Sequence, residues 1–275
     1  MKQIILCADD YSQNPGISQG ILKLLQEKRL SATTCMTNSI YWTVHGAWLK
    51  AFTGKADIGL HLNFTEGKPL SPALSLAQDG EFISLPQLMI RAGLRRLNGQ
   101  AITHELNAQL DAFVAVMGQL PDFIDGHQHI HHLPIIRDRL LEVYKDRLQA
   151  NGTYLRSVIT SCSSLKKAAL QFTGAYTFKK QLIKYKTPHN TSFSGVYQFR
   201  DNINYRKLFL GFLQEINNGG LIMCHPGLLV DHSTANHDPI NKNRAIEFQY
   251  LSSHDFTQDC QDNAIQISRY SNAMN

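Results

Sequence analysis

Ile4-Ile5-Leu6-Cys7-Ala8 is a short, continuously apolar run that ends in two adjacent carboxylates, Asp9 and Asp10. A run of this kind, without polar residues at alternate positions, is typical of a strand buried on both faces of a parallel sheet. Apolar residues at helical spacing between residues 17 and 28 predict that a helix follows this strand. The start of the chain therefore predicts a strand–helix unit with two carboxylates at the carboxyl end of its strand.

The same alternation continues along the rest of the chain. Further strands are predicted at residues 32–36, 58–63, 123–124, 154–156, 221–225 and 265–268. Further helices are predicted at residues 42–52, 85–97, 102–117, 134–148, 162–185, 205–216 and 244–251. Residues 65–85 contain Pro and Gly at irregular positions and predict a long loop, which in a compact domain is often a functional lid.

Repeated strand–helix units predict an α/β fold with a parallel sheet. About seven strands spread along the chain favour a closed or nearly closed (β/α) barrel, TIM-like in regular or irregular form, over a doubly wound open sheet. No GxGxxG motif follows the first strand, which argues against dinucleotide binding. Because no change in composition marks a linker, residues 1–275 are predicted to form a single domain.

The composition is that of a soluble globular protein, with 43% hydrophobic and 18% charged residues. The net charge of +5 is mild and the basic residues are scattered, so we expect no nucleic-acid partner. No apolar segment approaches transmembrane length, and the first apolar run is too short for a signal peptide. These features predict a cytoplasmic protein without a membrane span.

The cysteines indicate neither a disulfide framework nor a thiolate metal site. They are odd in number, far apart and without a CxxC pair, at Cys7, Cys35, Cys162, Cys224 and Cys260.

The strongest functional signal is the stretch Asp125-Gly126-His127-Gln128-His129-Ile130-His131-His132. It places four of the twelve histidines within six residues, directly after a short apolar segment. Histidines at alternate positions would share one face if the backbone were extended. A metal site and a solvated, His-rich turn are the two interpretations of this stretch.

Titratable groups lie at four of the predicted strand ends: Asp9 and Asp10, His61, residues 125–131, and His225. In parallel α/β proteins the carboxyl ends of the strands meet on one face, where functional sites form. This pattern predicts an Asp/His metal centre with additional acid and base groups. Asp9 and Asp10 would face opposite sides of an ideal strand, so both reach one site only if the strand breaks into a loop there. The alternative is that one of them only caps the next helix.

Four segments together resemble the YdjC-like carbohydrate deacetylases, a family that includes chitooligosaccharide deacetylase and is distantly similar to NodB-type polysaccharide deacetylases. In the order and approximate spacing of that family, they are Ala8-Asp9-Asp10-Tyr11, Gly59-Leu60-His61-Leu62-Asn63, Asp125-Gly126-His127-Gln128-His129-Ile130-His131 and Met223-Cys224-His225-Pro226-Gly227. The resemblance covers nearly the whole chain and implies a (β/α) barrel.

The resemblance also implies roles for individual residues. Asp10, His61 and His127 would hold one divalent metal ion. Asp9 would be the general base and His225 the general acid. Arg156 would orient the catalytic Asp, although a charge at the surface end of a strand is the alternative.

The remaining residues of the histidine cluster are given supporting roles. We expect His129 and His131 to hold another group or to contact substrate rather than to bind the metal directly. Asp125 is expected to orient His127, and His132 is expected at the surface.

The function implied is hydrolysis of the N-acetyl group of a small acetylated amino sugar, such as a chitooligosaccharide. Zn or Mg is the expected metal, with Mn, Co and Fe as alternatives. The rival enzyme classes are amidohydrolases and phosphoesterases. Amidohydrolase barrels usually carry an HxH pair after the first strand, whereas here the HxH pairs come midway along the chain. The non-enzymatic alternative is a carbohydrate-binding protein of the same fold. The sequence does not fix the oligomeric state, and a homodimer is compatible with it.

Overall fold

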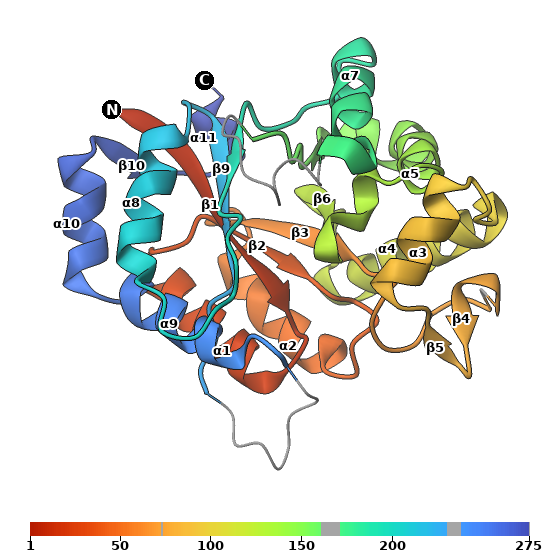
Figure 1. Cartoon of the computed structure of the whole chain (residues 1–275), viewed down its shortest axis with the longest axis horizontal. Helices are drawn as coiled ribbons and strands as arrows, with labels where there is room; N and C mark the ends of the chain where they lie inside the picture. Colours follow the sequence, from red (N-terminus) through yellow and green to blue (C-terminus); the bar gives the residue numbers. More distant parts are fainter. Residues whose placement is uncertain (73, 161–170, 230–237, 275) are drawn as a thin grey trace.

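A curved, parallel β-sheet forms the centre of the protein. The computed structural model describes residues 1–72, 74–160, 171–229 and 238–274 (Figure 1). The order of strands across the sheet is β7-β6-β3-β2-β1-β9-β8, and β10 pairs with β1. The strands of this sheet are β1 (Lys2–Tyr11), β2 (Ala32–Cys35), β3 (Asp57–Leu62), β6 (Phe123–Gly126), β7 (Tyr154–Leu155), β8 (Phe193–Ser194), β9 (Gly220–Cys224) and β10 (Ile265–Ile267). All their pairings are parallel, so their carboxyl ends lie at one edge.

Helices cover the outside of this sheet (Figure 1). The α-helices are α1 (Pro15–Gln26), α2 (Trp42–Leu49), α3 (Leu85–Gly93), α4 (Gly99–Met117), α5 (Ile136–Val143), α7 (Tyr176–Lys184), α8 (Tyr205–Glu215), α9 (Asn241–Leu251), α10 (His254–Asp262) and α11 (Tyr270–Ala273). Shorter helical turns are η1 (Lys50–Phe52), η2 (Leu74–Leu76), η3 (His127–His132), η4 (Tyr144–Leu148), η5 (Gln149–Asn151) and η6 (Gln171–Ala175). The predicted (β/α) barrel is confirmed in irregular form, because the parallel sheet curls into a half-barrel and no pairing of β7 with β8 closes it among the described residues.

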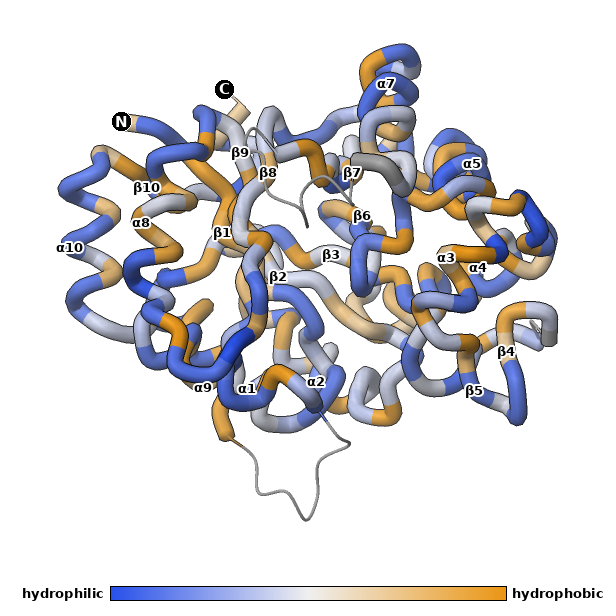
Figure 2. The backbone as a smooth tube through the Cα atoms, in the orientation of Figure 1, coloured by the Kyte–Doolittle hydropathy of each residue, from blue (hydrophilic) through white to orange (hydrophobic). Residues whose placement is uncertain are grey.

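Residues 4–8 of β1 are all apolar because the two faces of this strand belong to two different cores. Ile4, Leu6 and Ala8 pack into the larger core with residues of the surrounding helices. Ile5 and Cys7 point the other way, into a smaller core inside the curve of the sheet. All five side chains are fully buried, so alternation of polar and apolar residues would be costly here. Figure 2 shows the apolar character of β1 in orange.

The two ends of the sheet approach each other through the segment that leads into β8. The Leu155 N–H in β7 donates to the carbonyl of Pro188 at 2.9 Å. The Asn190 side chain accepts from the Ser157 N–H and donates to the Ser157 carbonyl, each at 2.8 Å. A buried amide side chain thus stands where strand pairing would otherwise close the barrel.

Several elements differ from the sequence prediction. Strand β8 and helices α10 and α11 were not predicted, because two-residue strands and polar helices carry little periodic signal. The loop at residues 65–85 contains a hairpin of β4 (Ala77–Gln78) and β5 (Glu81–Phe82). The predicted helix at 162–185 ends as α7, while Cys162 and the rest of 161–170 lie outside the described residues. Among the described residues, no helix combines the length and apolar composition needed to cross a membrane.

Candidate metal centre and catalytic cavity

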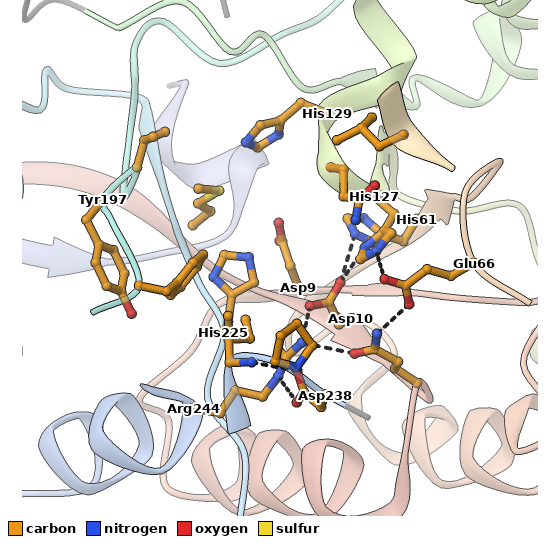
Figure 3. Close-up of a pocket in the computed structure, with 18 of the residues that line it drawn as sticks. Asp9, Asp10, His61, Glu66, His127, His129, Tyr197, His225, Asp238 and Arg244 are labelled. Carbon is orange, nitrogen blue, oxygen red and sulfur yellow. Dashed lines mark hydrogen bonds and ion pairs between the residues drawn. The ribbon is translucent and has the colours of Figure 1, made fainter. Parts of the chain in front are cut away.

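The carboxyl ends of β1, β3, β6 and β9 open into a cavity of about 460 Å³ (Figure 3). The sequence-predicted residues that line it are Asp9, Asp10, His61, His127, His129 and His225. The four strand ends therefore converge in the structure. Further lining residues that the sequence did not indicate are Glu66, Gln13, Asp238 and Arg244.

A bulge in β1 lets both adjacent carboxylates reach this cavity. Asp10 has a left-handed backbone with φ of 66°, and the pairing of β1 with β2 shifts register between Ala8 and Tyr11. The strand thus breaks at Asp10, as predicted for both carboxylates to reach one site. The helix-capping alternative does not apply, because the side chain of Asn14 caps α1.

Asp10, His61 and His127 form a compact, buried group in which a divalent cation fits. Asp10 Oδ1 lies 3.2 Å from His61 Nε2 and 2.9 Å from His127 Nδ1. One ligand atom from each residue lies within 4.8 Å of the other two. Arg244 Nη2 holds the other oxygen of Asp10 at 2.8 Å. Two imidazoles and one carboxylate are a donor set typical of a catalytic metal with open positions.

The remaining ring nitrogen of each histidine in this group faces a carboxylate. His61 Nδ1 lies 2.6 Å from Asp125 Oδ1, and His127 Nε2 lies 2.9 Å from Glu66 Oε1. Metal-binding histidines commonly have this kind of partner, which sets the tautomer and the ring orientation. The prediction that Asp125 orients His127 is wrong. Asp125 pairs with His61, because the two residues are register partners in β3 and β6.

Sequence reasoning missed Glu66, which partners His127. Asn63 follows β3, and its side-chain oxygen accepts from the Thr65 and Glu66 N–H groups at 3.0 Å each. This turn brings Glu66 back over the end of β3, where Gln13 also donates to it at 2.7 Å. The sequence did carry a signal for this turn. Asn63 comes directly after the strand that contains His61, and the carboxylate of Glu66 follows three residues later.

The histidine cluster is a turn rather than an extended segment. Strand β6 ends at Gly126, and the backbone then enters left-handed conformations at Gln128 and His129, with φ of 52° and 60°. A side chain at Gly126 would lie 2.9 Å from the His131 backbone nitrogen, so the tight turn requires glycine there. Only the first histidine of the cluster therefore joins Asp10 and His61.

The last two histidines of the cluster are buried. His131 Nε2 donates to the carbonyl of Arg156 at 3.0 Å and supports the neighbouring strand end. His132 hydrogen-bonds Thr173 at 2.8 Å. The prediction of a surface position for His132 is wrong, because the turn folds its side chain inward to 2% exposure.

Arg156 is fully buried and bridges two carboxylates. Its two terminal nitrogens each donate to one oxygen of Asp9 at 2.7 Å, and Nη2 also lies 2.6 Å from Asp125 Oδ2. The alternative of a surface charge is therefore excluded. Burial alone would raise the pKa of Asp9, but the charge and hydrogen bonds of Arg156 lower it to about 2. Cys7, Asp9 and Asp125 also lie within 4.8 Å of one another, but all three already contact the Arg156 guanidinium.

His225 lies at the end of β9, opposite the candidate metal group (Figure 3). Its backbone N–H donates to Glu247 at 2.6 Å, and its ring meets the edge of Phe199 with 5.4 Å between centroids. Glu247 is fully buried and also accepts a hydrogen bond from the Tyr197 hydroxyl. Glu247 thereby anchors the backbone that carries His225, another role that the sequence did not indicate.

Sequence comparisons match this chain to a family model and to two relatives that share one name. A family model described as YdjC-like protein matches residues 3–262. A chitooligosaccharide deacetylase of Yersinia enterocolitica is 28% identical over 234 residues, which are 83% of each chain. A protein of the same name from Yersinia pestis is 37% identical over 136 residues, or 49% of this chain and 53% of that protein.

A solved structure shares the fold over almost its full length. It is a protein from Enterococcus faecalis V583 described as a candidate cellobiose-phosphate cleavage protein. The two chains superpose with a TM-score of 0.77 over 98% of each, at 22% sequence identity. At that identity the likeness concerns the fold.

Proposed function

The chain belongs to the YdjC-like family, and we propose that it is a metal-dependent deacetylase that hydrolyses the N-acetyl group of an acetylated amino sugar. The observation that carries the proposal is the meeting of Asp10, His61 and His127 with Asp9 and His225 in one cavity. The names of the Yersinia relatives support a chitooligosaccharide-like substrate.

The proposed metal ligands are Asp10, His61 and His127, with Zn or Mg as the expected ion and Mn, Co or Fe as alternatives. When bound, a divalent ion would lower the pKa of water to roughly 7 and polarise the acetyl carbonyl. Asp125 and Glu66 hold the rings of His61 and His127 in the orientation that this requires.

Asp9 and His225 divide the proton transfers of amide hydrolysis between them. Asp9 takes a proton from the water whose oxygen attacks the acetyl carbon. His225 gives a proton to the nitrogen as the C–N bond breaks, because an amide anion is a very poor leaving group. The products are acetate and the free amino sugar.

The low pKa of Asp9 limits its strength as a general base. A general base works best when its pKa lies near the working pH, so a carboxylate with a pKa of about 2 would be a weak base for ordinary water. A divalent cation held by Asp10, His61 and His127 would make this water acidic enough for such a base. Arg156 keeps Asp9 ionised and holds both of its oxygens in fixed positions.

Release of acetate tests the proposed function directly. We expect the purified protein, supplied with a divalent metal, to release acetate from N-acetylated sugars in a panel from chitobiose to longer oligomers and glycolipids. A chelator should abolish the release, and the metal should restore it. Protein that binds the metal but releases acetate from no member of the panel would contradict the proposal.

Replacing Glu66 by Gln is expected to weaken metal affinity about tenfold. The neutral amide still accepts from His127 but no longer raises the basicity of the ring, and loss of such partners typically costs 10- to 100-fold in affinity. Isothermal titration of the metal-free protein measures the change. Glu81→Gln, an exposed carboxylate of the same loop, is the matched control. Equal affinity in Glu66→Gln and wild type would rule out the orienting role.

Metal binding is expected to release protons. In the metal-free protein, burial would lower the pKa values of His61 and His127, but nearby carboxylates outweigh burial. Asp125 and Asp10 raise that of His61 to about 9, and Asp10 and Glu66 raise that of His127 to about 10. These raised values stabilise the metal-free fold at low and neutral pH, and this contribution is lost as the pH rises through about 9 to 10.

Both rings are therefore protonated at pH 7, and each must lose a proton to bind a metal. We expect release of up to about two protons per metal at pH 7 and affinity that increases with pH until about pH 10, where the second ring has lost its proton. Titration calorimetry in buffers of different ionisation enthalpy counts the protons. Binding without proton release at pH 7 would contradict this assignment of the ligands.

A further inference from the structure

His129 holds an unusual backbone conformation at the edge of the cavity. Gln128 and His129 are consecutive residues in the left-handed region, with φ of 52° and 60°. Residues other than glycine in this region store strain, and such strain is concentrated at functional sites where surrounding structure enforces it. The turn therefore holds the His129 side chain in one place at a cost to the fold.

One ring nitrogen of His129 lacks a polar partner that would explain this cost among the residues that the structure describes. Its Nδ1 is buried yet forms no hydrogen bond to any residue that the structure describes. Its ring meets Phe193 edge-on, with 5.6 Å between centroids. The side chain lines the cavity and lies across it from Asp9 and His225 (Figure 3).

We propose that His129 contacts the substrate and donates a hydrogen bond to the acetyl carbonyl oxygen as that oxygen becomes negative. The inference rests on the proposed deacetylase function. An imidazole keeps at least one N–H donor in either protonation state, so the role does not depend on its titration. A donor fixed in advance stabilises the transition state more than the bound substrate, and loss of one such donor typically costs 10²- to 10³-fold in kcat.

Two other roles would be expected to behave differently. A histidine that only packs against Phe193 would affect stability and activity together. A histidine that binds a sugar hydroxyl would affect KM more than kcat, because that contact is equally strong before and during the reaction.

The test compares His129→Gly with His129→Asn, because both residues tolerate the left-handed backbone and only Asn keeps an N–H donor. We expect His129→Gly to lower kcat about 10²-fold, with KM within threefold of wild type and metal affinity unchanged. His129→Asn should recover part of kcat. Relief of strain should offset the packing lost at Phe193, so that the Tm of His129→Gly stays within about 2 °C of wild type.

The matched control is Lys28→Gly, an exposed residue outside the cavity with φ of 55°. It relieves the same kind of backbone strain without loss of a packed ring, and its kcat should equal that of wild type. A fall in kcat accompanied by a Tm lower by more than about 5 °C, a rise in KM alone, or lost metal affinity would each overturn the inference. If wild type is active and His129→Gly has the same kcat, this inference is overturned while the proposed function stands. Wild-type protein that releases no acetate would overturn the proposed function and this inference with it.

Discussion

Replacing Asp9 by Asn is expected to lower kcat about 10³-fold while the protein still binds its metal. The amide cannot accept the proton that Asp9 is proposed to take from water, and general bases typically contribute 10²- to 10⁴-fold. Metal binding should persist because the proposed ligands are Asp10, His61 and His127, and the bulge directs the two adjacent carboxylates to different partners. Asp9 pairs with Arg156, whereas Asp10 pairs with the two histidines and Arg244.

Acetate release and metal titration on the same preparation measure the two properties separately. Asp146→Asn, the same substitution at an exposed position, is the matched control and should match wild type in both. Activity retained in Asp9→Asn would exclude Asp9 as the base. Loss of metal together with activity would instead place Asp9 among the metal ligands.

Replacing Arg156 by Met is expected to lower the free energy of unfolding by about 3–5 kcal/mol. The fully buried guanidinium is the cation that Asp9 and Asp125 share, and its removal leaves Asp9 buried without its ion-pair partner and Asp125 with His61 alone. Activity should fall as well, because Asp9 loses both hydrogen bonds that fix its oxygens. Urea denaturation of the metal-free protein measures the stability change, with the exposed Arg96→Met as control.

Arg156→Lys separates charge from geometry. A lysine restores a positive charge but cannot hold both oxygens of Asp9 in the planar, two-bond arrangement of a guanidinium. We expect it to recover part of the stability and little of the activity. An unfolding free energy for Arg156→Met within about 1 kcal/mol of wild type would contradict the bridging role, since surface charges typically contribute no more than that.

The convergence of the four strand ends was predictable from the order of residues alone. In a parallel sheet every strand ends at the same edge, so Asp9, Asp10, His61 and His225 needed only correct strand assignments to be placed together. The apolar run at β1 was decisive, because a strand buried on both faces belongs inside such a sheet.

The partners of these residues were not predictable in the same way. Arg156 lies 147 positions from Asp9, and the weak strand around it carries no signal that distinguishes a buried cation from a surface one. Asp125 was assigned to the wrong histidine because proximity in sequence suggested His127, whereas strand register places it beside His61. The position of Glu66 was not predictable because it lies in a loop whose path depends on the side-chain hydrogen bonds of Asn63.

The sequence by itself determined the parallel α/β architecture and the edge of the sheet where the titratable residues gather. These depend on burial and periodicity, which act over a few neighbouring residues and can be read along the chain. Only the tertiary structure decided which side chains touch. The bulge at Asp10, the left-handed turn at His129 and the burial of Arg156 depend on packing between segments far apart in the chain. The run from Ile4 to Asp10 thus specified a strand with acids at its end, and the fold assigned one acid to Arg156 and the other to two histidines.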